Sequence, residues 1–102
     1  MHPLIEARRE QIHSLCTKYR VRRLALFGSA SLEGAREVGD FDFLIEFQPL
    51  HPIQHADNYF SLLSDLERLL NGRVDLVEFS TLRNPFLKSS IEASQVALYD
   101  AA

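Results

Sequence analysis

Intrachain disulfides and membrane-spanning segments are both excluded by what the sequence lacks. Cys16 is the single cysteine, so neither an intrachain disulfide nor a cysteine zinc cage can form, which is typical of proteins in a reducing cytoplasm. The apolar runs are far shorter than the ~18 residues that cross a membrane. The first residues, 1–4, lack the charged-then-apolar pattern of a signal peptide. We therefore expect a soluble, cytoplasmic protein without a membrane partner.

A surplus of positive charge is missing as well. The formal net charge is −3, because acidic residues offset the local arginine clusters at 8–9 and 20–23. Dedicated nucleic-acid-binding domains normally carry a basic surplus, so we expect no direct nucleic-acid binding. Repeats, low-complexity segments and linkers are absent. With 102 residues, of which 46% are hydrophobic and 25% charged, the chain is predicted to form a single domain over residues 1–102.

Apolar residues recur at helical spacing in two segments. A first helix is predicted over residues 4–20, with one apolar side formed by Ile5, Ile12, Leu15, Cys16 and Tyr19. A second is predicted over 56–70, with an apolar side of Ala56, Tyr59, Phe60, Leu63, Leu66 and Leu70, and a left-handed stop at Asn71-Gly72. Asn84-Pro85 begins a last helix, with asparagine as the cap. We interpret Cys16, Tyr59 and Phe60 as core residues.

Shorter apolar runs predict four strands, over residues 21–27, 40–47, 73–79 and 96–99, the last of them at an edge of the sheet. A short helix capped by Ser29 is expected between the first two. Helices and strands then alternate, which predicts an α+β fold (an α/β sandwich) with a small sheet of about four strands and covering helices. The early strands are joined by too little chain for a parallel crossover. The sheet is therefore predicted to be mixed.

The most specific motif is Gly28-Ser29, followed by ten residues and then Asp40-Phe41-Asp42. Side chains two apart on a strand point to the same face, so Asp40 and Asp42 face one way while the phenylalanines face the other. Two neighbouring carboxylates repel each other unless a cation or a proton lies between them. The spacing therefore predicts a site for Mg²⁺, a cation that prefers carboxylate oxygens.

Such a site normally needs a third acidic ligand, and Asp75 is the best candidate because it interrupts an apolar strand. A buried charge there would be costly unless a metal compensated it. For the phosphates of a nucleotide, Gly28 would permit a close backbone approach and Ser29 would add a hydroxyl donor. Arg36 could reach phosphate oxygens from the loop between the two strands. Each feature also has a simpler interpretation: a plain turn, solvated acids and a solvated arginine.

The histidines share no common scaffold in the sequence. His51 and His55 are four residues apart, but Pro52 lies between them and argues against one continuous helix there. We interpret all four histidines as surface residues; the other two are His2 and His13.

The sequence resembles the DNA polymerase β-like nucleotidyltransferases, whose GSx10DxD signature matches Phe27-Gly28-Ser29, the ten-residue gap and the run DFDFLIEF at 40–47. The short length and the segment VDLV at 74–77 resemble the minimal nucleotidyltransferase subgroup. So does the ending, with its IEA at 91–93 and ALY at 97–99. The resemblance covers almost the whole chain and implies the nucleotidyltransferase fold.

The resemblance also implies a site and an activity. Gly28 and Ser29 would contact the nucleotide phosphates, and Asp40, Asp42 and Asp75 would bind Mg²⁺ and carry the catalysis. Many members of the subgroup are antitoxins encoded beside a ribonuclease toxin of the HEPN (higher eukaryotes and prokaryotes nucleotide-binding) class. Such a member transfers AMP from ATP to a tyrosine of that toxin and so silences it. The resemblance therefore implies ATP as co-substrate and a hetero-complex with a HEPN-type toxin.

The sequence departs from the family pattern just after Gly28-Ser29. Members commonly carry arginines where this chain has Ala30 and Leu32, whereas Arg36 keeps its usual place. These differences favour an alternative, in which the protein neutralises its toxin by binding alone. Transfer to a small molecule such as an aminoglycoside ranks last, since the chain lacks an obvious acceptor domain. Self-association remains compatible with the sequence.

Overall fold

The structure, a computed structural model, describes residues 2–28 and 40–101, and of Asp40 it describes the backbone alone. Four strands form one sheet in the order β3-β2-β1-β4. They are β1 (Val21–Phe27), β2 (Asp40–Phe47), β3 (Arg73–Glu78) and β4 (Val96–Asp100). β1 runs antiparallel to β2 and β4, whereas β2 and β3 are parallel. The predicted mixed sheet and the edge position of the last strand are confirmed.

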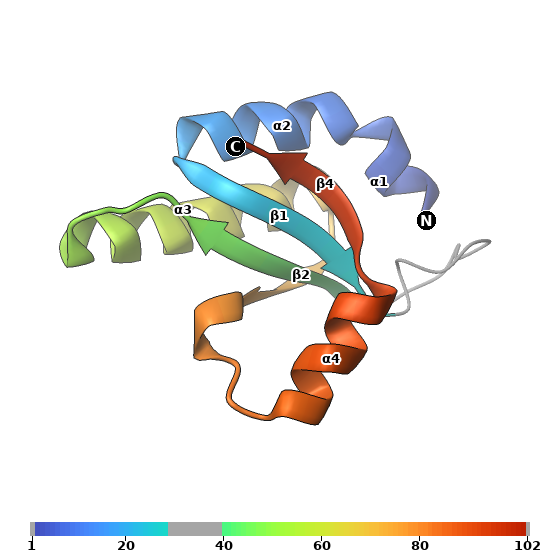
Figure 1. Cartoon of the computed structure of the whole chain (residues 1–102). Helices are drawn as coiled ribbons and strands as arrows, with labels where there is room; N and C mark the ends of the chain where they lie inside the picture. Colours follow the sequence, from blue (N-terminus) through green and yellow to red (C-terminus); the bar gives the residue numbers. More distant parts are fainter. Residues whose placement is uncertain (1, 29–39, 102) are drawn as a thin grey trace.

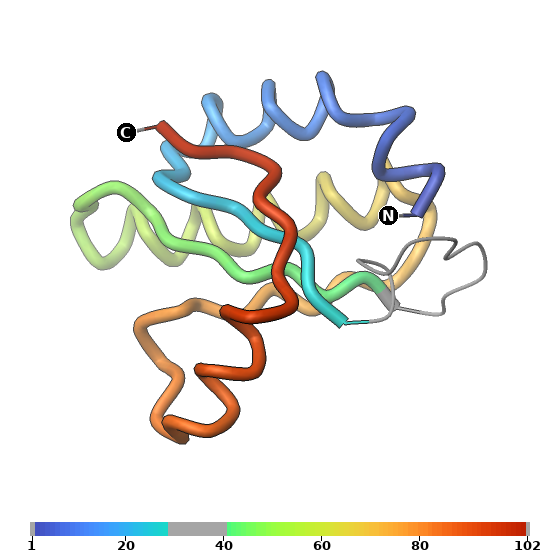
Figure 2. The backbone as a smooth tube through the Cα atoms, turned by 45° about the vertical axis from the view of Figure 1, so that its right-hand side comes forward, coloured from blue at the N-terminus to red at the C-terminus, as the bar shows by residue number. Residues whose placement is uncertain are grey.

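Helices cover both faces of this sheet (Figure 1). On one face lie α1 (Pro3–Ala7), α2 (Arg9–Lys18) and α3 (Pro52–Leu70), and on the other lie η2 (Phe79–Thr81) and α4 (Pro85–Ser94). Figure 2 shows from a second angle that α4 lies apart from the other helices. No helix within the described ranges has the length and apolar character needed to span a bilayer. The layered α+β architecture is the predicted one.

Each face of the sheet has its own apolar core, because strand side chains alternate between the two faces. In the larger core, Phe43 and Leu26 of the sheet pack with residues of α2 and α3 such as Ile12 and Leu66. In the smaller core, Leu44 and Ala25 pack with Ile91 of α4. Phe41, Phe43 and Ile45 all belong to the larger core. The predicted alternation of β2 is therefore confirmed, and Asp42 points to the face that carries α4.

The predicted first helix over 4–20 is wrong in one respect, because it is two helices. The chain turns at Arg8, which has φ −108° and ψ 15°. Ile5 of α1 and Ile12 of α2 are both fully buried. Neither glycine nor proline occurs near Arg8, so the sequence carries none of the usual signals for a helix break. Cys16 is buried in the larger core, as predicted.

Helix α3 begins at Pro52, four residues before the predicted start at 56. Proline suits the first helical position because its missing N–H would have no partner there, and the Ile53 N–H donates to Nδ1 of His51 at 3.3 Å. The predicted stop is confirmed: Asn71 adopts the left-handed conformation with φ 51°. The predicted cap of α4 is also confirmed, since Oδ1 of Asn84 accepts from two backbone N–H groups.

The prediction that Phe60 belongs to the core is wrong. Its side chain is 66% exposed, whereas the neighbouring Tyr59 is half-buried and packs against the larger core. The two residues are about 100° apart around the helix axis, so only one of them can point at the sheet. Strand β3 ends at Glu78, one residue before the predicted end, because Phe79 already begins η2.

Candidate active site

The sheet brings two of the predicted carboxylates side by side. Asp42 of β2 pairs in register with Asp75 of β3. Paired residues of parallel strands share a face and lie ~4.8 Å apart across the ladder. The pair Leu44 and Val77, two residues farther along, packs in the core beneath α4. Asp42 and Asp75 therefore lie on the α4 face of the sheet, on neighbouring strands.

Gly28 lies directly against the Asp42 carboxylate. It follows β1, whose last residue, Phe27, pairs with Asp42 across the antiparallel ladder. Its φ of +74° is in the left-handed region, and a Cβ added there would lie 2.5 Å from Oδ2 of Asp42. Any side chain at this position would be strained and would also displace the carboxylate. Glycine is thus required both by the backbone conformation and by the space.

Three of the predicted site residues cannot be placed completely. Ser29 and Arg36 lie outside the described residues, as do Ala30 and Leu32. For Asp40 the backbone is described, and it begins β2 two residues before Asp42. The three-carboxylate arrangement and the phosphate contacts of Gly28, Ser29 and Arg36 stay predictions.

The donor set fits a divalent metal ion. Two acidic side chains on adjacent strands offer oxygen ligands from one face, which is the chemistry that Mg²⁺ prefers. Among the described side chains, no three His, Cys, Asp or Glu groups lie close enough together to hold a metal. Asp75 is exposed, so the expectation of a buried charge at this position is wrong. An exposed carboxylate can stay charged without a metal at little cost in free energy. The argument for the metal site therefore depends on the position of Asp75 beside Asp42, not on its burial.

Residues 10–102 match the family model described as Polymerase beta, Nucleotidyltransferase. The chain belongs to this nucleotidyltransferase family. The protein adenylyltransferase MntA of Thermococcus cleftensis is 32% identical over 88 residues, or 78% of this chain and 86% of that protein. MJ1379 of Methanocaldococcus jannaschii, provisionally named a protein adenylyltransferase, is 36% identical over 75 residues, or 74% of each chain.

Solved structures agree on the fold of this nucleotidyltransferase. A structure provisionally described as a minimal nucleotidyltransferase has a TM-score of 0.73 and 33% identity, with 90% of each chain covered. The complex of a tri-AMPylated HEPN toxin with MNT antitoxin from Shewanella oneidensis contains a chain with a TM-score of 0.64 and 20% identity. That match covers 94% of this chain and 72% of the other. At such low identity the likeness concerns the fold alone.

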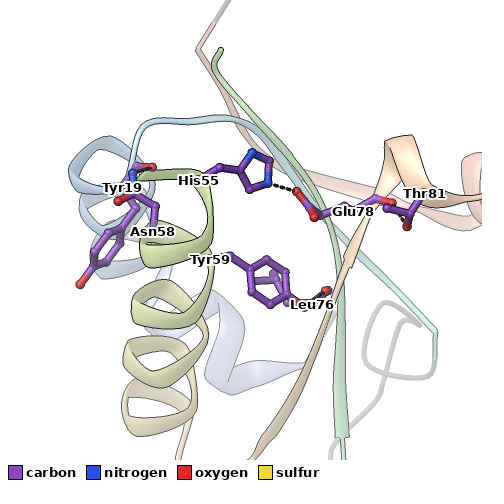
Figure 3. A network of polar contacts seen from close by, with 7 residues as sticks. All are labelled: Tyr19, His55, Asn58, Tyr59, Leu76, Glu78 and Thr81. Carbon is purple, nitrogen blue, oxygen red and sulfur yellow. Dashed lines mark hydrogen bonds and ion pairs between the residues drawn. The ribbon is translucent and has the colours of Figure 1, made fainter. Parts of the chain in front are cut away.

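In this nucleotidyltransferase, polar contacts from α3 fix the strand that carries Asp75 (Figure 3). The Tyr59 hydroxyl donates to the backbone carbonyl of Leu76 at 2.5 Å, next to Asp75 in β3. Nε2 of His55 contacts Oε1 of Glu78, near the end of the same strand. Burial of the Tyr59 side chain, with smaller contributions from the charges of Glu78 and Asp75, raises the pKa of Tyr59. These contacts hold the second half of this edge strand against α3.

The interpretation of the histidines as surface residues is confirmed for His13 and His51, which are exposed, and is wrong for His2 and His55. His55 is half-buried, and its ring centroid lies 4.9 Å from that of Phe47. Nε2 of His13 lies 2.6 Å from the carbonyl oxygen of Leu98 in β4. The sequence signal for the position of His55 was Pro52. Proline is favoured at the first position of a helix, so a helix that begins at Pro52 includes His55.

Arg73 is a cation near the candidate site that the sequence motif does not reveal. It begins β3 and pairs in register with Asp40, two residues before Asp75. The available signal was its spacing from Asp75, since residues two apart on a strand share a face. This cation therefore stands at the edge of the acidic site.

Proposed function

We propose that this nucleotidyltransferase transfers AMP from ATP to a tyrosine of a partner protein of the HEPN toxin class, with Mg²⁺, and so acts as an antitoxin. The relatives named as protein adenylyltransferases support the class of reaction. The complex of an AMPylated HEPN toxin with MNT antitoxin supports the class of partner through its shared fold. The pairing of Asp42 with Asp75 beside Gly28 is the observation that carries the proposal.

The reaction divides into bond making and bond breaking at one phosphorus atom. The tyrosine oxygen bonds to the α-phosphorus of ATP, and its proton passes to the solvent. The bond from that phosphorus to the bridging oxygen breaks, and pyrophosphate leaves with the electron pair. Bound Mg²⁺ would neutralise the charge that develops on the phosphate oxygens.

The protein's own residues would position these groups. Asp42 and Asp75, together with Asp40, would hold the metal from one face of the sheet. Gly28 has no Cβ to displace the Asp42 carboxylate, so the triphosphate could approach both the backbone and that carboxylate closely. The fixed strands keep the carboxylates in place before the substrate arrives, which lowers the reorganisation required during the reaction.

A second candidate function is neutralisation of the toxin by binding alone. The observation that favours it is the presence of Ala30 and Leu32 at positions where the family commonly has arginines. Fewer phosphate contacts would weaken nucleotide binding while leaving the fold able to dock a partner. The paired carboxylates favour the enzyme over this alternative.

One experiment separates the two functions. The protein is mixed with ATP labelled at the α-phosphate, Mg²⁺ and a HEPN-type toxin encoded beside it, and label on the toxin is measured. We expect labelling that is lost in the double variant Asp40→Asn/Asp42→Asn and kept in Asp57→Asn, an exposed residue of α3. Absence of transfer, with neutralisation intact in the double variant, would establish the binding function instead.

A further inference from the structure

Arg73 occupies a fixed place at the edge of the acidic site. Its register partner is Asp40 and the next pair along the ladder on this face is Asp42 with Asp75. Strands in a sheet are ~4.8 Å apart and residues two apart on a strand are ~6.7 Å apart. Val74 and Leu76 pack in the core on the α3 face, while Val77 packs in the α4-face core. Arg73 therefore shares the α4 face with the carboxylates.

The backbone around Arg73 is held on both sides. Before it, Asn71 makes the left-handed stop of α3, and a Cβ added to Gly72 would lie 3.1 Å from the ring of Phe41. After it, the Val74 N–H donates to Oε2 of Glu67 at 3.4 Å. The side chain of Arg73 is exposed. A long cationic side chain is thus attached at a fixed backbone position beside the site.

The charge balance of the proposed site favours a cation at the position of Arg73. Three carboxylates and a triphosphate together carry more negative charge than two divalent ions neutralise, so a further cation stabilises bound nucleotide. Arginines at positions 30 and 32 could supply such a cation, but this chain has Ala30 and Leu32 there. Arginine is also the side chain best suited to phosphate, because its planar group donates two parallel hydrogen bonds.

We propose that Arg73 binds a phosphate group of the nucleotide and so substitutes for the arginines missing after Ser29. This inference rests on the proposed nucleotidyl transfer, and it assigns to β3 a second role beside that of Asp75. A purely structural arginine would pair with the carboxylates and leave nucleotide affinity unchanged. A phosphate ligand contributes to nucleotide affinity directly.

The test compares Arg73→Gln and Arg73→Lys with the wild-type protein. Binding is measured by displacement of a fluorescent ATP analogue in Mg²⁺, and folding by thermal unfolding. Arg22→Gln is the control, because Arg22 lies at the opposite end of β1, is 59% exposed and pairs with Glu46 at 3.0 Å. We expect Arg73→Gln to weaken Mg·ATP binding about tenfold or more. Arg73→Lys keeps the charge but not the paired hydrogen bonds, so its affinity should fall between those of Arg73→Gln and the wild type, and Arg22→Gln should keep the wild-type affinity.

Each other outcome has a definite meaning. If Arg73→Gln binds Mg·ATP as tightly as the wild type, Arg73 is not a phosphate ligand, while the proposed function stands. If both Arg73 variants lose binding together with a large fall in unfolding temperature, the role of Arg73 is structural and the inference is overturned. If the wild-type protein itself binds no Mg·ATP, both the inference and the proposed function fail.

Discussion

Gly28 leaves just enough room for the carboxylate of Asp42. A Cβ built on Gly28 would lie 2.5 Å from Oδ2 of Asp42, and the φ of Gly28 is +74°. The turn after β1 and the start of β2 are therefore matched, since the turn needs a residue without a side chain and the carboxylate occupies the vacant space. The glycine of the sequence motif has a geometric reason as well as a chemical one.

The variant Gly28→Ala tests this match. Alanine in the left-handed conformation costs about 1–2 kcal/mol, and its methyl group would displace the Asp42 carboxylate. We expect the free energy of unfolding to fall by about that amount and Mg·ATP affinity to fall at least about tenfold. Chemical unfolding and nucleotide displacement measure the two effects.

The variant Gly28→Asn separates the effect of backbone strain at position 28 from the effect of displacing the Asp42 carboxylate. Asparagine tolerates the left-handed region better than alanine but also has a Cβ atom. It should therefore recover part of the stability without recovering nucleotide affinity. Wild-type Mg·ATP affinity in both variants would show that the contact between Gly28 and Asp42 has no part in binding.

Cys16 should be chemically inert in the folded protein. Burial raises the pKa of the Cys16 thiol from 9.0 to about 12, and only the thiolate reacts with alkylating reagents. We expect no modification by iodoacetamide at pH 8 until the protein unfolds. Alkylation is followed by mass spectrometry. Rapid alkylation of Cys16 in the native protein would contradict the burial of this residue.

The same pKa shift predicts how stability depends on pH. Because the folded pKa of Cys16 lies above the unfolded one, the folded state keeps its proton more tightly. The contribution is fully present below about pH 9 and is lost as pH rises toward 12. Cys16→Ala should show a shallower loss of unfolding free energy than the wild type over this range. If the curves of unfolding free energy against pH were parallel for the two proteins, the thiol would not contribute to the pH dependence of stability.

Tyr59 and Phe60 are neighbours on α3 with opposite expected effects. Tyr59→Phe removes the hydrogen bond to the Leu76 carbonyl, which is 2.5 Å long, and should cost about 1 kcal/mol of unfolding free energy. Phe60→Ser changes a side chain that is 66% exposed and should cost under about 0.5 kcal/mol. Denaturant titration of both variants measures the difference. Equal costs would contradict the orientation of α3.

Strand signals in the sequence were strong because each strand has one face toward α1–α3 and one toward α4. The alternation in β2 therefore predicted both the strand and the face on which its phenylalanines pack. The stops of α3 and the cap of α4 followed from single residues, Asn71 and Asn84, whose local chemistry decides the conformation. These features are determined by residues that are close together in the sequence, so they can be predicted from the sequence alone.

Features that depend on tertiary contacts were less predictable. The break at Arg8, between the buried Ile5 and Ile12, has no local signal. Phe60 fits an apolar helix pattern, yet the helix can turn only one of two adjacent aromatic residues toward the sheet. The pairing of Asp75 with Asp42 and of Arg73 with Asp40 depends on the register of β3, which no segment of the sequence specifies alone.

The most direct test of the account is Mg²⁺-dependent ATP binding by Asp75→Asn, with Asp57→Asn as the matched control. Asp75 is exposed and pairs with Asp42, so asparagine should leave the fold intact while removing a metal ligand. The account predicts at least about a tenfold loss of Mg²⁺-dependent affinity in Asp75→Asn and none in Asp57→Asn. Unchanged Mg²⁺ dependence in Asp75→Asn would contradict the assignment of Asp75 to the metal–nucleotide site.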